Sequence, residues 1–167
     1  MPDAGPDGAR DNNLDYGPLG QSLGFLLRLA QLRSFATFYK DMGALDIRPG
    51  EMTLLMVLAE NPGVRQGILA KALRIKRAHM TKMVHGMEAD GLIARTVPEG
   101  DKRSVELWLT EAGRARIDAV RPDFGRHEAK ATGPLTQAEA AELRRLLRRY
   151  VGFDVPADAG CDGGGMR

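Results

Sequence analysis

Apolar residues recur at helical spacing in several segments of the chain, and this pattern predicts a mainly helical protein. The expected helices cover residues 18–43, 49–61, 66–73 and 76–90, a segment that begins at Thr110, and a last segment from Thr136 to about residue 151. Residues 92–98 and 105–109 carry apolar and β-branched runs instead, which predicts two strands. The expected fold class is therefore mainly α with a small β-wing.

The order of elements between residues 66 and 113 organises the rest of the chain. A short helix, a turn and a second helix are followed by two strands, with a charged turn at residues 99–104 between them. This is the layout of a winged helix-turn-helix, a module that places its second helix in the major groove of DNA. The flanking helices would then form a frame that holds two such modules in a dimer.

The second helix of this module has an apolar stripe and a basic face. Met80, Met83, Val84 and Met87 form the stripe that we expect to be buried. A recognition helix reads bases with its N-terminal residues. The residues off the stripe in its first two turns are therefore the predicted DNA contacts: Lys76, Arg77, Ala78, His79, Thr81 and Lys82. Taken alone, an ordinary amphipathic helix with a solvated basic face explains this pattern equally well.

The charged turn between the strands supplies a second set of predicted DNA contacts. Lys102 and Arg103 stand near its tip, and an arginine there can enter a narrow, strongly negative minor groove. Asp101 is placed to hold the Arg103 guanidinium through a charge-assisted hydrogen bond. A generic charged hairpin turn is the alternative interpretation of this segment.

Two motifs resemble the MarR family of bacterial transcriptional regulators. Residues 101–113, Asp-Lys-Arg-Ser-Val-Glu-Leu-Trp-Leu-Thr-Glu-Ala-Gly, resemble the family's wing signature of Asp-x-Arg, a strand and Leu-Thr-x-x-Gly. Residues 81–93 resemble its recognition helix and the exit from that helix, and the likeness runs from about residue 19 to residue 150. Residues 76–79 depart from the small hydroxyl residues that many relatives carry, which leaves the operator sequence open.

The resemblance implies a homodimeric DNA-binding repressor that leaves a pseudo-palindromic operator when a small effector binds. Such effectors are often aromatic or phenolic acids, and coenzyme A thioesters of such acids are a further possibility. They bind between the dimer helices and the winged module, and they favour a conformation in which the recognition helices are spaced differently. The residues that would line such a site here are Arg28, Phe35, Phe38, Tyr39, Met52 and Met56. The methionines could equally fill the core.

The expected domain organisation follows from these elements. It comprises a disordered tail at 1–16, an N-terminal dimerisation helix at 17–47, a winged helix-turn-helix at 48–110, C-terminal dimerisation helices at 111–152 and a disordered tail at 153–167. The first helix is apolar over more than one stripe, so it needs a partner besides its own domain. Pro122 is expected to kink or interrupt the fifth helix. Thr136 and Glu139 form a predicted capping box before the last helix.

Charge and composition narrow the function. The net charge is only +2, but residues 65–103 carry nine Lys and Arg residues against four Asp and Glu residues, the footprint of a phosphate-binding face. The single cysteine, Cys161, excludes a disulfide within the chain, and His79, His85 and His127 lack zinc-type spacing. We therefore expect no metal, no cofactor and no enzyme activity.

The expected partners are double-stranded DNA, a second copy of the chain and a small effector. Without an apolar run long enough to span a bilayer or a signal-peptide pattern, a cytoplasmic location is expected. The alternative function is a winged-helix module that binds an acidic protein instead of specific DNA. His127 is expected to be a partly exposed structural residue, and the place of Trp108 is left open.

Overall fold

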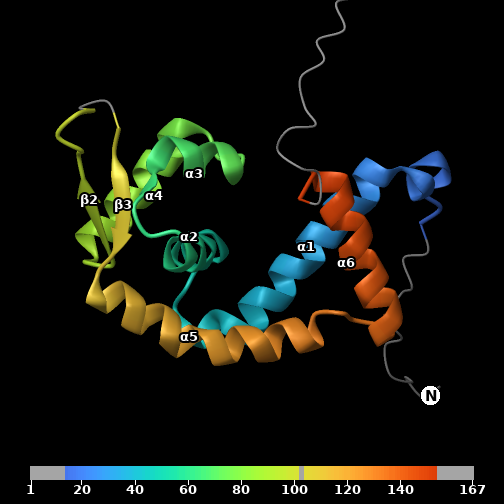
Figure 1. Cartoon of the computed structure of the whole chain (residues 1–167). Helices are drawn as coiled ribbons and strands as arrows, with labels where there is room; N and C mark the ends of the chain where they lie inside the picture. The colour runs from blue at the N-terminus through green and yellow to red at the C-terminus, as the bar shows by residue number, and fades with distance from the viewer. Residues whose placement is uncertain (1–13, 102–103, 154–167) are drawn as a thin grey trace, which may run out of the picture.

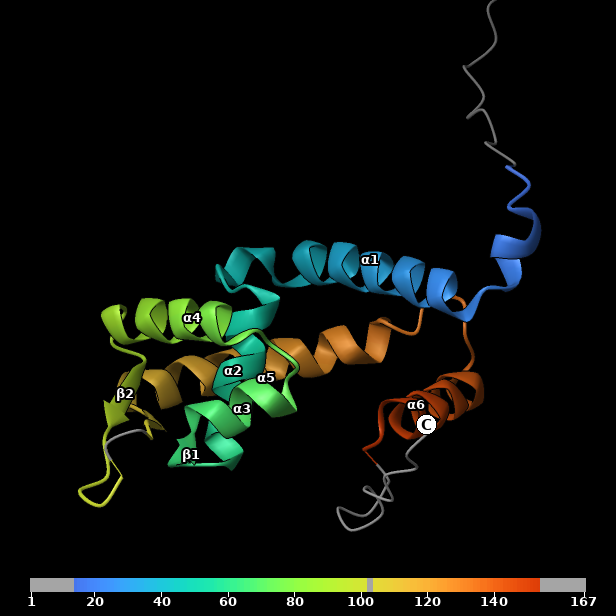
Figure 2. The same cartoon turned by 90° about the horizontal axis from the view of Figure 1, so that it is seen from above.

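The computed structural model describes residues 14–101 and 104–153, which form a winged module and a helical arm (Figure 1). The elements in chain order are η1 (Gly17–Gln21), α1 (Leu23–Met42), η2 (Gly43–Leu45), α2 (Pro49–Glu60), β1 (Val64–Arg65), α3 (Gln66–Ala72), α4 (Arg77–Ala89), β2 (Ile93–Thr96), β3 (Glu106–Leu109), α5 (Glu111–Lys130) and α6 (Gln137–Val151). Helices α2, α3 and α4 and the sheet form the module, and α6 lies to its side. The C-terminal end of α1 packs on the module, because Phe38 and Met42 are buried in the same core. Helix α5 runs from the module to the arm (Figure 2).

The N-terminal helix is shorter than predicted. The chain forms the 3₁₀ turn η1 first, and Ser22 then adopts an extended conformation before α1 begins at Leu23. The Ser22 hydroxyl accepts a hydrogen bond from the Phe25 backbone N–H at 3.5 Å, as an N-cap residue does. The prediction of one helix over residues 18–43 is therefore wrong at its start, because the extended backbone of Ser22 separates η1 from α1.

The helix-turn-helix forms where it was predicted, but helical spacing predicts a buried stripe of Ile68, Leu69, Ala72 and Leu73 on α3, and the observed face differs. Leu69 and Ala70 are buried, whereas Ile68 is 59% exposed, and Ala72 is exposed as well. Helix α3 has only seven residues, so two overlapping faces fit its helical period equally well. Packing against α4 selects the face that contains Ala70.

The sheet contains a strand that the sequence pattern did not predict. Strand β1 pairs with β3, which pairs in turn with β2, so the order is β1-β3-β2 with both pairings antiparallel. The two predicted strands are also shorter than expected, at four residues each. Gly63 has a φ of 76° at the turn before β1, and its N–H donates to the Leu107 carbonyl oxygen at 3.0 Å. This turn brings β1 against β3.

Trp108 covers the turn before β1. A Cβ atom at Gly63 would lie 2.6 Å from the Trp108 ring, so the indole packs directly on the glycine. The Trp108 indole N–H also donates to the Thr96 hydroxyl of β2 at 3.0 Å. The side chain therefore lies across the sheet face opposite the core, and Trp108 is 38% exposed.

Apolar side chains from α2, α4, β3 and α5 form one core beneath the exposed face of α4. The largest fully buried side chains in the described residues include Leu54, Leu55, Leu58, Leu69, Met80, Val84, Ile93, Leu107, Ile117 and Val120. Helix α2 lies in the centre of this arrangement (Figure 1). Met80, Val84 and Met87 of the predicted stripe are buried in this core, so the basic face of α4 points outward. Met83, the fourth residue of that stripe, is only partly buried.

Helix α5 continues through Pro122, so of the two predicted effects of this proline, a kink or an interruption, the interruption is wrong. The helix is assigned without a break from Glu111 to Lys130. Proline removes one backbone N–H, which leaves the carbonyl of Asp118 without its helical partner. Asp118, Arg121 and Pro122 are all exposed, so water can bond that carbonyl and the helix tolerates the proline.

The junction of α1 and α5 is held by a buried polar pair. His127 is 4% exposed, and its Nδ1 lies 2.9 Å from Oδ2 of Asp41. Its ring packs edge-on against Phe38 at a centroid distance of 5.7 Å. His127 is therefore a structural residue as expected, but it is buried and not partly exposed.

Helix α6 begins with the predicted capping box and leaves most of its apolar side chains exposed. Thr136 and Glu139 exchange the two reciprocal capping bonds. Ala140 is the buried residue of this helix. At its other end, the Arg74 guanidinium donates to the Val151 carbonyl oxygen at 3.2 Å. Among the described helices, none combines the length and hydrophobicity that a bilayer span requires.

Candidate nucleic-acid interface

The N-terminal turns of α4 form an exposed, mainly basic surface. Every predicted contact residue from this helix start is exposed, namely Lys76, Arg77, Ala78, His79, Thr81 and Lys82. Met80 and Val84 are fully buried and Met87 nearly so, and they anchor the opposite face of the helix in the core. The packing thus fixes α4 rigidly while its first two turns remain accessible to a large partner.

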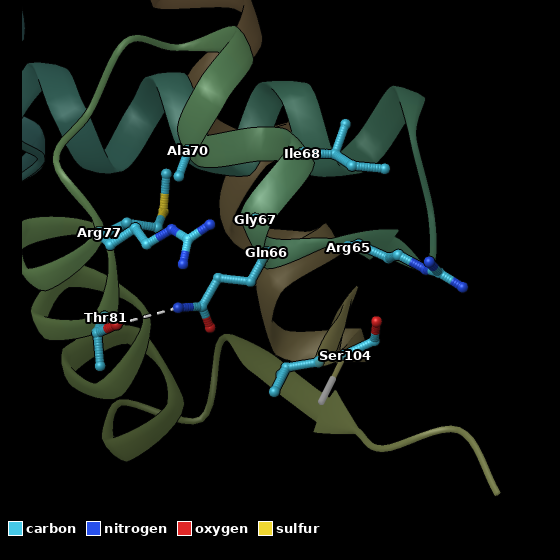
Figure 3. Close-up of a pocket in the computed structure, with 10 residues that line it drawn as sticks. Arg65, Gln66, Gly67, Ile68, Ala70, Arg77, Thr81 and Ser104 are labelled. Atoms are coloured by element: carbon cyan, nitrogen blue, oxygen red, sulfur yellow. Dashed lines mark hydrogen bonds between the residues drawn. The ribbon is translucent and has the colours of Figure 1, made fainter. Parts of the chain in front are cut away.

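These side chains divide between two flanks of α4. Arg77 and Thr81 lie on the flank toward α3 and the start of β3, beside a hollow of about 370 Å³ (Figure 3). His79 and Lys82 lie on the other flank, beside a groove of about 520 Å³. The sequence pattern identified the set of exposed residues but not this division.

The hollow contains polar residues that the sequence analysis did not single out. The Gln66 side-chain amide donates to the Thr81 hydroxyl at 3.1 Å, which links the start of α3 to α4 (Figure 3). Arg65 and Ser104 also line the hollow. A signal for Gln66 was present in the sequence, because the first residue of the helix before a recognition helix lies near that helix in a helix-turn-helix.

Asp101 organises the base of the wing. Its Oδ2 accepts a hydrogen bond from the Ser104 hydroxyl at 2.5 Å and lies 3.8 Å from Nη1 of Arg65. These contacts connect the wing to β1. The two other predicted wing contacts, Lys102 and Arg103, lie outside the described residues, so the expected bond between Asp101 and Arg103 stays a prediction.

Two of the six predicted ligand-binding residues line the groove on the other flank of α4. Phe35 and Tyr39 of α1 line it. The remaining residues that line it are Arg48, Pro49, Gly50, Glu51, His79, Lys82, Met83, Gly86, Met87 and Asp90. The site therefore lies between α1, the start of α2 and α4, which is where an effector site between the dimer helices and the winged module was expected.

The other four predicted ligand-binding residues do not line this groove. Phe38 and Met52 are each only 5% exposed and belong to the core. Met56 packs against that core, and Arg28 is exposed on α1 outside the groove. Phe38 does not line the groove because it faces α5, where it contacts His127. The aromatic and methionine residues among these four therefore belong to the core or pack against it, and they do not line a ligand site.

The charged residues of the groove were missed because they come from two other helices. Arg48 and Glu51 belong to the start of α2, and Asp90 follows the end of α4. Burial raises the pKa of the Glu51 carboxyl above its ordinary value, against the lowering effects of the Arg116 charge and the Arg48 backbone N–H. Glu51 is thus an acid held under partial desolvation at the wall of the groove.

Glu51→Gln is expected to stabilise the fold more at neutral pH than in acid. With a raised pKa in the folded state, the folded chain binds more protons than the unfolded chain once the pH exceeds the ordinary glutamate value, so ionisation lowers stability as the pH rises. Glutamine carries no charge at any pH. The melting temperature of the variant minus that of the parent should therefore be larger at about pH 7 than at about pH 4.

Glu111→Gln is the matched control for this measurement. Glu111 also lies in the first turn of a helix, but it is exposed. The control removes a carboxylate that favours the positive end of a helix dipole without relieving any burial. If both variants show the same dependence on pH, burial of Glu51 does not affect stability.

Among the described residues, no metal site accompanies the groove or the hollow. Within residues 14–101 and 104–153, no group of three or more His, Cys, Asp and Glu residues is placed to hold a metal ion. His85 lies 3.0 Å from Nη1 of Arg95 through its Nε2, and Arg95 also pairs with Glu88 at 2.7 Å. These side chains connect α4 to β2.

Comparisons with known proteins give consistent matches. Residues 47–105 match the MarR family. A protein of Thauera aromatica, named as a putative transcriptional regulatory protein for the hcr operon, is 31% identical over 147 residues, which cover 87% of this chain and 89% of that protein. The HTH-type transcriptional repressor NicR of Pseudomonas putida is 28% identical over 152 residues, covering 91% of this chain and 96% of that protein.

Solved structures match over similar lengths. The transcriptional repressor CouR, bound to a 23-mer DNA duplex, superposes with a TM-score of 0.76 at 32% identity, covering 83% of this chain and 98% of that chain. BpsR of Bordetella bronchiseptica, whose DNA binding is regulated by 6-hydroxynicotinic acid, superposes with a TM-score of 0.72 at 26% identity, covering 77% and 98%.

Proposed function

The chain belongs to the MarR family, and from this premise we propose that it is a homodimeric repressor which binds a pseudo-palindromic DNA operator and releases it when a small aromatic effector binds. The observation that carries the proposal is the exposed basic start of α4 beside the base of the wing. The similar proteins are transcriptional regulators and not enzymes. Transcriptional regulation is accordingly the general function of this chain.

Charge and shape support DNA as the partner. Lys76, Arg77 and Lys82 present cations on a helix whose other face is fixed in the core. Cations on such a surface bind phosphates, and a helix of this size enters the major groove. CouR, which is similar over most of its length, is bound to a DNA duplex. We propose that α4 is the recognition helix and that residues 101–104 contact the neighbouring minor groove.

Exposed apolar surfaces on the arm support a homodimer. Within the described residues, the large apolar side chains exposed on η1, α1 and α6 include Leu19, Leu23, Leu26, Leu29, Leu32, Leu143, Leu146, Tyr150 and Val151. Single exposed apolar residues are ordinary, but so many on neighbouring helices mark an interface. A two-fold dimer through these helices would present two α4 helices to half-sites about 34 Å apart.

The groove supports a small aromatic or phenolic acid, or its coenzyme A thioester, as the effector. Phe35 and Tyr39 offer aromatic surface, and Arg48 and Lys82 offer cations for a carboxylate. The regulation of BpsR by 6-hydroxynicotinic acid gives one example of this chemistry in a similar protein. The volume of about 520 Å³ is that of a small-molecule site.

Selection of duplexes from a random pool, followed by mobility shifts, tests the proposal. We expect the chain to enrich a pseudo-palindrome and to bind it at least about 10³-fold more tightly than unrelated DNA. Weak binding that is equal for all sequences would reject the repressor. It would favour the alternative, in which the basic face of α4 binds an acidic protein.

Arg77→Ala is expected to weaken binding to the selected operator by about 1–3 kcal/mol and to relax the preference at one base pair. An arginine that reads guanine makes two hydrogen bonds that alanine cannot replace. Binding measured on a set of single-base operator variants would detect the relaxed position. An equal loss on every sequence would mean that Arg77 contacts only phosphate. Arg114→Ala, which removes a cation from the exposed face of α5, is the control.

Arg103→Ala is expected to weaken operator binding by about 1–3 kcal/mol without dissociating the dimer. Arg103 lies outside the described residues, so this prediction rests on the wing signature and on Asp101 at the base of the wing. The measurement combines operator affinity with a solution mass. Unchanged affinity would show that the wing does not contact DNA.

A further inference from the structure

Helix α4 presents His79 and Lys82 to two surfaces at once. Both side chains are exposed within the stretch that we propose contacts DNA, and both line the groove beside α1. Arg77 and Thr81 line the hollow on the opposite flank and do not reach the groove. Two of the proposed DNA contacts are thus within reach of a molecule in the groove, while two others are not.

Fixed charges at the walls of the groove are balanced. Arg48 and Lys82 contribute two cations, while Glu51 and Asp90 contribute two carboxylates. An anion that enters the groove must therefore bind a cation that is not already paired with one of these carboxylates. Within the described residues, neither Arg48 nor Lys82 takes part in an ion pair, and of these two cations only Lys82 also belongs to the proposed DNA-contacting surface. A flexible four-carbon stem lets its ammonium turn either into the groove or toward a phosphate.

Aromatic surface fixes where such an anion would sit. Phe35 and Tyr39 are four residues apart, so they lie on one face of α1 and form one wall of the groove. A ring stacked on this wall carries its carboxylate toward α4, where His79 and Lys82 form the opposite wall. The Lys82 ammonium can donate a charge-assisted bond to that carboxylate or neutralise a DNA phosphate, but its one charge cannot fully serve both.

We propose that an aromatic anion in the groove and DNA compete for His79 and Lys82 within each subunit. The inference rests on the proposed function above and adds a direct route of release to it. DNA binding then weakens subunit by subunit, without any change in the distance between the two recognition helices. This differs from the spacing mechanism that the sequence resemblance implies.

Competition and spacing predict different results on a single half-site. A change of spacing cannot affect a duplex that engages only one recognition helix. Competition weakens binding to that half-site duplex by the same factor per subunit as it weakens binding to the palindrome. It also withdraws a phosphate-binding cation, so the slope of log affinity against log salt concentration becomes shallower by about 0.9 for each cation withdrawn.

A tethered aromatic anion tests the proposal without a known effector. In a Cys161→Ser background, Tyr39→Cys places one thiol at the wall of the groove, and 4-carboxybenzyl methanethiosulfonate attaches a benzoate there through a mixed disulfide. Benzyl methanethiosulfonate gives the uncharged control. Ala119→Cys, exposed on α5, gives the control position. Phe35→Cys is a second anchor should melting curves or the solution mass show that Tyr39→Cys disturbs the protein.

The duplexes are the palindrome selected by the unlabelled protein and its isolated half-site. We expect the benzoate label to weaken binding to both by about tenfold or more, the loss of one charge-assisted bond, and the benzyl label to weaken it less. In a Lys82→Ala,His79→Ala background, the additional effect of the benzoate should largely disappear.

Three results would overturn the competition. These are an effect on the palindrome alone, no effect on either duplex, or an undiminished effect when His79 and Lys82 are absent. Failure of the proposed function itself would be seen earlier and separately, because the unlabelled protein would then select no preferred duplex.

Discussion

Gly113→Ala is expected to destabilise the chain by about 3 kcal/mol, the upper part of the usual range for overpacking a core. A Cβ atom at Gly113 would lie 2.1 Å from the Leu92 carbonyl oxygen and 3.1 Å from its carbon. Both contacts are with backbone, so no side chain can rotate to make room. The start of α5 or the segment before β2 would have to move.

Hydrogen bonds oppose that movement. The Thr110 N–H donates to the same Leu92 oxygen at 3.1 Å, and the Thr110 hydroxyl donates to the Gly91 carbonyl oxygen at 2.6 Å. The Gly113 N–H donates in turn to the Thr110 hydroxyl at 3.0 Å. Threonine and glycine three residues apart thus fasten the wing strands to α5, which gives a physical reason for the Leu-Thr-x-x-Gly motif.

Gly125→Ala is the matched control for this prediction. It makes the same change in the same helix, but nothing lies within 4 Å of a Cβ atom there. Alanine in a helix interior is more favourable than glycine by about 1 kcal/mol, so this variant should be stabilised. Urea denaturation at equal protein concentration measures both free energies of unfolding. If Gly113→Ala were also stabilised, the close approach of Gly113 to Leu92 would not exist in solution.

The elements that the sequence predicted well are those stabilised by contacts between residues of the same short segment. The capping box of Thr136 and Glu139, the Thr110 cap and the stripe of α4 each join residues three or four positions apart. Such contacts follow from the helical period and from side-chain chemistry alone. The order of these elements was enough to indicate the winged helix-turn-helix.

The elements that were missed depend on distant partners. Strand β1 has two residues, and it exists because Val64 pairs with Leu107 in β3. A segment that short carries no pattern of its own. The continuous α5 likewise depends on exposure of the backbone around Pro122, which periodicity does not report.

The groove lies between α1 and the winged module, where the resemblance implies an effector site, but only two of the six predicted residues line it. Binding of an effector there stays a prediction. Periodicity showed that α1 has several apolar faces, but it could not decide which face meets α5 and which meets α4. Phe38 faces α5, while Phe35 and Tyr39 border the groove beside α4. The charged walls come from helices far apart in the sequence, so only the fold brings Arg48 and Lys82 to the same site.

Leu143→Glu,Leu146→Glu is expected to convert the proposed dimer into monomers and to weaken binding to the palindromic operator by about 10²- to 10⁴-fold. The two leucines are 45% and 47% exposed in the single chain, so glutamates there cost little within one subunit. In a dimer interface they would bury two charges per subunit without partners. Loss of the second subunit removes the high effective concentration of the second recognition helix.

Ala141→Glu provides the control on the same helix. Ala141 is exposed and lies on the side of α6 away from the leucine stripe. It adds a carboxylate to α6 without entering the proposed interface, so mass and affinity should stay unchanged. Light scattering during gel filtration gives the mass, and fluorescence anisotropy on the palindrome and on the half-site gives the affinities.

Half-site affinity separates a lost dimer from a damaged fold. The core of the winged module comes from α2, α3, α4, the sheet, α5 and the end of α1, and it contains no residue of α6, so a folded monomer should bind a half-site with nearly the affinity of one subunit of the dimer. Parallel losses on half-site and palindrome would indicate that the module itself needs the dimer to stay folded. A variant that remained a dimer with full operator affinity would remove α6 from the interface, and the exposed leucines of α1 would then have to form it alone.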